Sequence, residues 1–263
     1  MKKIKKNITE NKGPIYCLKE SKNSIKIIIL IFILSTLLGF LNAKRLFFLN
    51  DVLKDIIEQA QDLSGLNLII FIFINNSLSS ILGLILGIFL GIFPIIITVT
   101  NGLVLGYVMN ITINKFGFIE LWRLLPHGII ELSAVFISLG LGLKIGTDVI
   151  KIYIKVHKNN SLMKVLGALS LFLGLIGISV IRLAFNLALD AQSLMPKYLL
   201  SVIIAILGII ALLPFFILFL YNDKKMRSFI LKRLDNSIKV FINIVMPLLI
   251  IAAIIEGLLI TLI

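Results

Sequence analysis

The chain has little of what a soluble protein needs. It contains one cysteine, Cys17, so an intramolecular disulfide is excluded. Charged residues make up only 15% of it, against about 25% in a typical soluble domain, while 59% of the residues are hydrophobic. The alternating segments of about ten residues that mark outer-membrane barrels are also missing. The composition therefore predicts an all-α fold, a polytopic transmembrane helical bundle.

Enzyme motifs are missing as well. The sequence has no Gly-x-Ser-x-Gly elbow, no phosphate-binding Walker A loop and no pair of aspartates on a loop of the kind used for phosphoryl chemistry. Nothing in it reads as an energy-coupling domain. We predict that the protein is not an enzyme and has no cofactor. Active transport would require a partner ATPase or an ion gradient.

Negative charge is scarce: 13 acidic residues stand against 26 basic ones, a net charge of +13. In a soluble protein this excess would point to nucleic acid. Here the basic residues lie between apolar runs, so the lipid bilayer explains them and we predict no nucleic-acid partner. With a cytoplasmic N-terminus, 19 Lys and Arg residues fall in inner segments and 6 in outer ones. This bias predicts a multi-pass cell-membrane protein with an outer C-terminus.

Apolar runs long enough to cross a bilayer are abundant, at a mean hydropathy of +1.09. Residues 1–24 form a basic cytoplasmic tail, and residues 25–263 are predicted to be a single transmembrane domain. The long apolar stretch 67–114 is divided at Pro94. The predicted spans, about seven, are 25–42, 68–93, 95–113, 121–142, 166–187, 198–220 and 241–262.

Two intervening segments have the pattern of surface helices. Residues 44–65 carry apolar residues at helical spacing with acidic residues between them, which predicts an amphipathic interfacial helix. Residues 144–164 are basic on one face, which suits a helix lying against an anionic cytoplasmic surface.

Small and amide side chains recur within the predicted spans. Glycines at four-residue spacing let helix backbones approach closely, and we predict that they pack helices together or support self-association. They are Gly83, Gly87, Gly91, Gly102 and Gly106. The amides of Asn75, Asn76 and Asn101 need partners in apolar surroundings; a packing role is the preferred interpretation.

His127 and Glu131 stand four residues apart, so a helix would place both on one face. Ionisable groups at membrane depth are expensive to bury, and each is a candidate functional position. A metal site would need three or four ligands, and the only other histidine, His157, is predicted on the cytoplasmic side, so we predict no metal. A proton or substrate path and a structural pair both stay open, and the structural pair is preferred.

Two further charges lie in apolar runs, Arg182 and Glu256. Together with Glu131 they are predicted on three spans, all toward the outer leaflet, where a buried Arg–Glu contact would satisfy both partners. Arg182 could instead extend to the membrane surface and contact nothing.

Several of these residues together resemble the stage II sporulation protein M family. The resemblance runs from about residue 46 to 263 and rests on Asn75-Asn76-Ser77, the glycine series, Asn101-Gly102, Leu125-Pro126-His127-Gly128 with Glu131-Leu132, and the closing segment from Pro247 to Glu256. It implies an integral membrane protein of about five spans, with 166–220 expanded here. The family's namesake is a scaffold that recruits cell-wall-degrading partners to the septum during engulfment. At the level of fold, the family is also similar to the membrane subunits of some ATP-driven exporters.

Two functions remain from these observations. The resemblance favours a non-catalytic scaffold or assembly subunit of a membrane or cell-envelope complex, which associates with itself or with other membrane proteins. The alternative is a transporter or permease subunit in which His127, Glu131 and Glu256 line a polar path.

Overall fold

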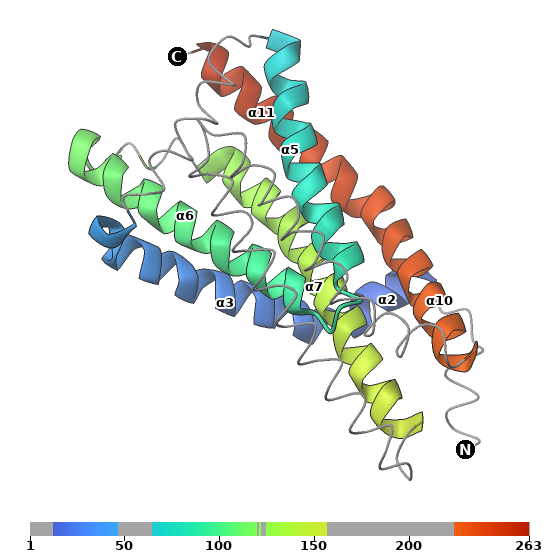
Figure 1. Ribbon diagram of the computed structural model, residues 1–263. Coiled ribbons are helices and arrows are strands. Elements are labelled where there is room, and N and C mark those ends of the chain that lie inside the picture. Colours follow the sequence, from blue (N-terminus) through green and yellow to red (C-terminus); the bar gives the residue numbers. More distant parts are fainter. Residues whose placement is uncertain (1–12, 47–64, 120, 122–124, 157–223, 263) are drawn as a thin grey trace, which may run out of the picture. The chain divides into compact units, whose positions relative to one another are not determined.

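The computed structural model describes residues 13–46, 65–119, 121, 125–156 and 224–262, and all of its regular structure there is helical (Figure 1). The elements are α2 (Pro14–Glu20), α3 (Lys22–Leu41), the short 3₁₀ turn η1 (Ala43–Arg45), α5 (Gly65–Leu86), α6 (Ile92–Phe116), α7 (Leu125–Val156), α10 (Lys224–Val240), the π-helical turn η4 (Phe241–Val245) and α11 (Met246–Leu262).

Five helices in the described ranges are long and apolar enough to cross a membrane. They correspond to the predicted spans 25–42, 68–93, 95–113, 121–142 and 241–262, and they confirm the all-helical membrane character. The predicted spans 166–187 and 198–220 lie outside the described residues, as does most of the predicted interfacial helix 44–65.

The chain divides into two compact units. The first comprises Met1–Asp148 and Leu231–Ile263, and the second comprises Val149–Ile230. The described part of the second unit is the end of α7, with exposed Lys151 and Lys155, and the start of α10, with exposed Arg227. The packing described below belongs to the first unit.

The break between α5 and α6 lies upstream of the predicted position at Pro94. Helix α5 ends at Leu86, and α6 begins at Ile92 after a tight turn. In that turn Leu90 and Gly91 have φ angles of 57° and 77°, a left-handed conformation that ends a helix. Pro94 lies in the first turn of α6, where a missing N–H breaks no helical hydrogen bond. Proline therefore marks a helix start here and not the break itself.

Two helices run beyond the bounds of the predicted spans. Helix α7 continues without interruption past residue 142 to Val156, where we predicted a separate basic helix, and the predicted span 241–262 is the end of a rod that begins with α10 and passes through the π-helical turn into α11. The 32 residues of α7 span about 48 Å, well beyond the hydrocarbon thickness of about 30 Å. A single helix can thus cross the bilayer and still carry its basic end into the aqueous phase.

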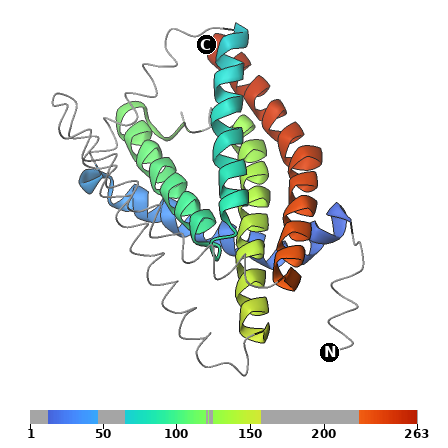
Figure 2. The same cartoon turned by 45° about the vertical axis from the view of Figure 1, so that its right-hand side comes forward.

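Helices α3 and α6 lie side by side in both views, and glycines bring their backbones together (Figures 1 and 2). A Cβ built on Gly102 would lie 2.8 Å from the carbonyl oxygen of Phe32, and one on Gly39 or Gly106 would overlap the backbone of the facing helix. Asn110 Nδ2 donates a hydrogen bond to the carbonyl of Phe40 at 3.1 Å, so this amide does hold two helices together.

Helix α7 packs against α5 and the α5–α6 turn in the same way. Gly142 leaves no room for a Cβ between it and the backbone of Gly83 and Leu84, and Gly146 lies against Gly91. Ser138 Oγ donates to the Ser80 carbonyl at 2.8 Å across this interface. An apolar core joins α3 to α7 and comprises Ile28, Val135, Leu139 and Leu143.

All five glycines of the predicted series are buried within the chain. Gly83, Gly102 and Gly106 contact facing helices, whereas Gly87 and Gly91 lie in the α5–α6 turn against α7. Their small size is used for packing inside one chain, and their predicted part in self-association stays a prediction.

Gly106→Ala should destabilise the protein, because the added methyl group would overlap the backbone of α3 at Thr36 and Phe40. We expect a loss of about 1–3 kcal/mol, as for other overpacked sites. The matched control is Gly128→Ala in α7, where a Cβ has open space and alanine favours the helix. Thermal unfolding of the detergent-solubilised variants measures both. Equal melting temperatures for the two variants would contradict the packing described.

Candidate functional site: an intramembrane cavity and a charged clasp

A cavity of about 960 Å³ lies among α3, α5, α6 and α7. Its volume is in the range of pockets that hold small molecules. Its wall is formed by Phe32, Asn75, Asn76, Ser79, Asn101, Val104, Leu105, Val108, Met109, Phe118, Ile119, Leu121, Gly128, Ile129, Glu131, Leu132 and Val135.

Four of the polar residues singled out in the sequence meet at this cavity. Asn75 and Asn76 lie near the middle of α5, Asn101 lies toward the middle of α6, and Glu131 lies in the N-terminal part of α7. Ser79 follows Asn75 by one helical turn and extends the same polar face. Three helices thus direct amide, hydroxyl and carboxyl groups into one space.

These polar groups have no protein partner in the part of the chain that the structure describes. Neither the three amides nor the Glu131 carboxyl forms a hydrogen bond there, in contrast to Asn110. Asn75 and Asn101 are exposed to the open space, and Asn76 and Glu131 are half-buried. An unpaired polar group in apolar surroundings is unfavourable, so these side chains are suited to water or a polar ligand.

Glu256 of α11 is near enough to Glu131 for their carboxyl groups to interact electrostatically. Two of the three charges predicted to share a site are thus brought together, and Arg182 lies outside the described residues. His127 is in the first turn of α7, one turn before Glu131, and its side chain is not among those described. Within the described ranges no group of three or more His, Cys, Asp or Glu side chains is placed to hold a metal.

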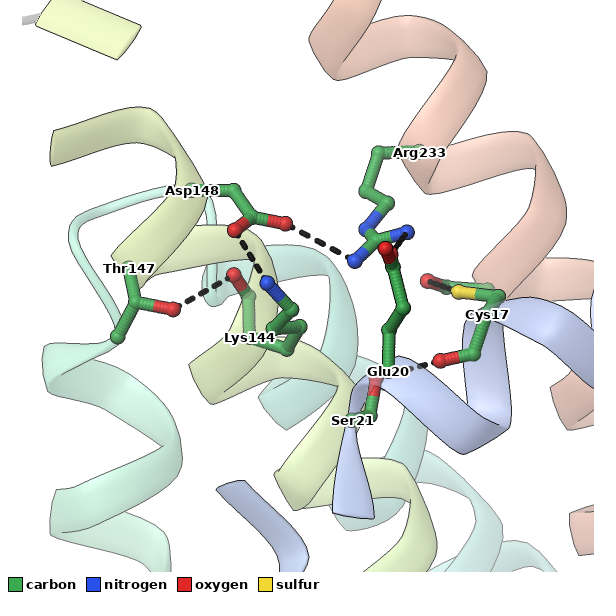
Figure 3. Close-up of polar contacts among 8 residues, drawn as sticks. Cys17, Glu20, Ser21, Lys144, Thr147, Asp148 and Arg233 are labelled. Atoms are coloured by element: carbon green, nitrogen blue, oxygen red, sulfur yellow. Dashed lines mark hydrogen bonds and ion pairs between the residues drawn. The ribbon is translucent and has the colours of Figure 1, made fainter. Parts of the chain in front are cut away.

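A second polar cluster lies at the basic ends of the helices. We call Glu20, Lys144, Asp148 and Arg233 the charged clasp. Figure 3 shows the Arg233 guanidinium of α10 between Glu20 of α2, at 2.5 Å, and Asp148 of α7, at 3.0 Å. Lys144 Nζ contacts the other oxygen of Asp148 at 2.5 Å. One arginine therefore joins three helices that are far apart in the sequence.

Neighbouring hydrogen bonds hold the clasp in place (Figure 3). Ser21 Oγ donates to the Cys17 carbonyl at 2.8 Å, and Thr147 Oγ1 donates to the Lys144 carbonyl at 2.9 Å. The Cys17 thiol lies 3.5 Å from the Ser237 hydroxyl, within hydrogen-bonding distance for sulfur. The first two contacts are local, and the third joins α2 to α10 beside the arginine.

The burial of the clasp residues determines how much their ion pairs contribute to stability. The side chains of Arg233 and Asp148 are each 11% exposed, and that of Glu20 is 37% exposed. Partial burial alone would raise the pKa of Glu20, but the hydrogen bond and charge of Arg233, assisted by Tyr16 and Lys144, outweigh it and hold this pKa below its ordinary value of 4.5. The ionised form of Glu20 is thus favoured by folding.

Sequence reasoning missed the clasp because its residues lie in basic segments that we assigned to the cytoplasmic face of the membrane without predicting contacts between them. One residue of the sequence could have indicated the clasp. Asp148 is the one acidic residue in the basic stretch 144–164, and it follows Lys144 by four residues. A lone acidic residue in a basic segment predicts an ion pair with a basic side chain. It does not predict which arginine forms that ion pair.

Comparison with known proteins bears on the cavity directly. The family model for stage II sporulation protein M matches residues 28–186, more than half of the chain. The chain belongs to the stage II sporulation protein M family. No curated protein and no solved structure matches it. Every residue that lines the cavity lies within the segment matched to the stage II sporulation protein M family, whereas Glu20 and Arg233 of the clasp lie outside it.

Arg233→Ala should be strongly destabilising, because it leaves Glu20 and the buried Asp148 without their shared cation. We expect a loss on the order of 3 kcal/mol, as for other buried pairs that lose one partner. Lys239→Ala is the matched control, since its pair with Asp235 is exposed and should contribute a few tenths of a kcal/mol. Thermal unfolding in detergent distinguishes them; similar melting temperatures would mean that the clasp contributes little.

The clasp also predicts an acid-sensitive component of stability. Because folding lowers the pKa of Glu20, its contribution is complete above the unfolded value of 4.5 and is lost as the pH falls through the folded value. The stability difference between the wild type and Glu20→Gln should be constant from about pH 7 to pH 5 and should shrink below pH 4.5. Unfolding midpoints across this range measure it. A difference that grows on acidification would refute the assignment.

Proposed function

We propose that the protein is a non-catalytic, multi-pass membrane subunit of a permease or transport complex and that it binds its ligand in the cavity. One observation carries the proposal: amide and carboxyl groups from α5, α6 and α7 converge on a space of about 960 Å³ and have no hydrogen-bond partner in the described residues. A purely structural role would have paired them, as Asn110 is paired.

Other features of the chain support a subunit over a self-sufficient transporter. The sequence carries no motif for nucleotide hydrolysis, so transport would be driven by a partner ATPase or by an ion gradient. We propose that the partner engages the basic, cytoplasmic ends of the helices. In that orientation the N-terminus is cytoplasmic, the C-terminus is outside, and the cavity extends from mid-membrane toward the outer leaflet.

The second candidate is the scaffold that the family resemblance implies. The clasp favours it, because one buried arginine fixes α2, α7 and α10 relative to one another at the basic ends of the helices. Such a fixed surface would suit the docking of an enzyme of the cell envelope. A scaffold has no evident use for unpaired polar groups in a cavity, and for this reason we rank it second.

The two candidates differ in what Glu131→Gln should do. As a ligand-binding residue, Glu131 is needed for activity and not for assembly, so the variant should keep wild-type abundance and partners while failing to restore the phenotype of a deletion strain. Affinity purification at native expression, with mass spectrometry of the co-purified proteins, provides the measurement. Asp235→Asn is the matched control, because it removes an exposed carboxylate that does not line the cavity.

If Glu131→Gln loses its partners together with its function, the scaffold is the better description. Full activity of the variant would show that Glu131 is needed neither for ligand binding nor for assembly with partners.

A further inference from the structure

We propose that the cavity selects hydrophobic organic cations, that is, amphipathic molecules that carry one positive charge on an apolar body. The inference rests on the proposed function, because it names the ligand class of the same cavity. Three properties of the cavity support it: the sign of its charge, the character of its walls and the region it reaches.

The first property is charge. Glu131 is the one ionisable side chain among the described residues that line the cavity, and Glu256 adds a second carboxyl group within electrostatic range. Burial at membrane depth disfavours an ionised carboxyl group, and a bound cation offsets this by stabilising the ionised form. The amide oxygens of Asn75, Asn76 and Asn101 can orient toward the same positive charge. An anion in this space would meet the field of both glutamates.

The second property is the wall around the polar groups. Apart from the amides, Ser79 and Glu131, the lining is dominated by aliphatic and aromatic side chains, including Val104, Leu105 and Val108 of α6. Such a wall favours an apolar body over a heavily hydroxylated solute. Phe32 and Phe118 also lie in the lining, and aromatic rings are a favourable neighbourhood for an organic cation.

The third property is the region that the cavity reaches. It extends to Phe118 and Ile119, which follow α6 and are both more than 70% exposed. A neighbouring apolar cavity of about 400 Å³ shares Phe32, Met109, Phe118 and Leu121 with it. Apolar surface therefore adjoins the polar centre, as suits a ligand that first partitions into the bilayer.

The test uses the full-length protein in phosphatidylcholine nanodiscs and three probes of similar bulk. Tetraphenylphosphonium is the cation, tetraphenylborate the anion and triphenylphosphine oxide the neutral compound, and saturable binding is measured by equilibrium dialysis against empty discs. We expect saturable binding of the cation in clear preference to the other two. Glu131→Gln should weaken cation binding by about tenfold or more, because it removes a charge and keeps the shape.

Two variants locate the binding. Val108→Phe fills the cavity and should weaken cation binding, whereas Asp235→Asn removes an exposed carboxylate and should leave it unchanged. Asn101→Asp adds a carboxylate to the cavity wall and should tighten cation binding severalfold. This variant keeps the inference testable should Glu131→Gln fail to fold, and an unchanged or weaker affinity for Asn101→Asp would overturn it.

The outcomes separate the inference from the function on which it rests. Equal binding of all three probes, weakened by Val108→Phe but not by Glu131→Gln, would overturn cation selectivity and leave the cavity as a ligand site. If no probe shows saturable binding, the selectivity for hydrophobic cations is refuted, whereas the proposed function is decided by the co-purification and phenotype of Glu131→Gln.

Discussion

Close approach of helix backbones at glycine is the constraint on which this bundle depends. Within a bilayer no hydrophobic force draws one helix to another, so association relies on tight packing and on hydrogen bonds between helices. Helix α6 shows how the constraint also creates the cavity. Gly102 contacts α3, and the preceding residue, Asn101, about 100° around the helix, lines the open space. One side of α6 is held against α3 by contact between the two backbones. On another side of α6, the larger polar side chain of Asn101 lines the cavity.

The sequence predicts the helices of this protein better than it predicts their meeting points. Apolar runs identify every described span, and the need to divide 67–114 follows from its length. The position of the break does not follow from the sequence. Leucine is not a residue type that indicates the left-handed conformation found at Leu90, and Pro94 is compatible with a helix start. Asn75, Asn101 and Glu131 each stand out as polar groups in apolar runs. Spacing within one helix shows which residues share a face, and it leaves open which faces converge on a cavity.

The clasp was beyond sequence reasoning for a related reason. Cys17 and Ser237, which lie beside it, are 220 residues apart. Local charge patterns predict pairs such as Lys144 with Asp148, four residues apart, but contain no information about an arginine from the far end of the chain. The segment matched to the family holds the whole cavity lining, and the clasp ties it to helices on either side of that segment. The residues that line the cavity and the residues of the clasp are thus two separate sets, and only the clasp includes residues outside the family-matched segment.

The π-helical turn η4 has a consequence for where charges point. Arg233 and Glu256 belong to one continuous helical rod, and in a regular α-helix their separation would place them about 140° apart around its axis. A π-helical turn winds in one extra residue, which reduces that angle to about 40°. The turn therefore changes the direction in which Glu256 points relative to Arg233, the residue that contacts Asp148 of α7. One helical rod thus contributes an arginine to the clasp and a carboxyl group to the neighbourhood of the cavity.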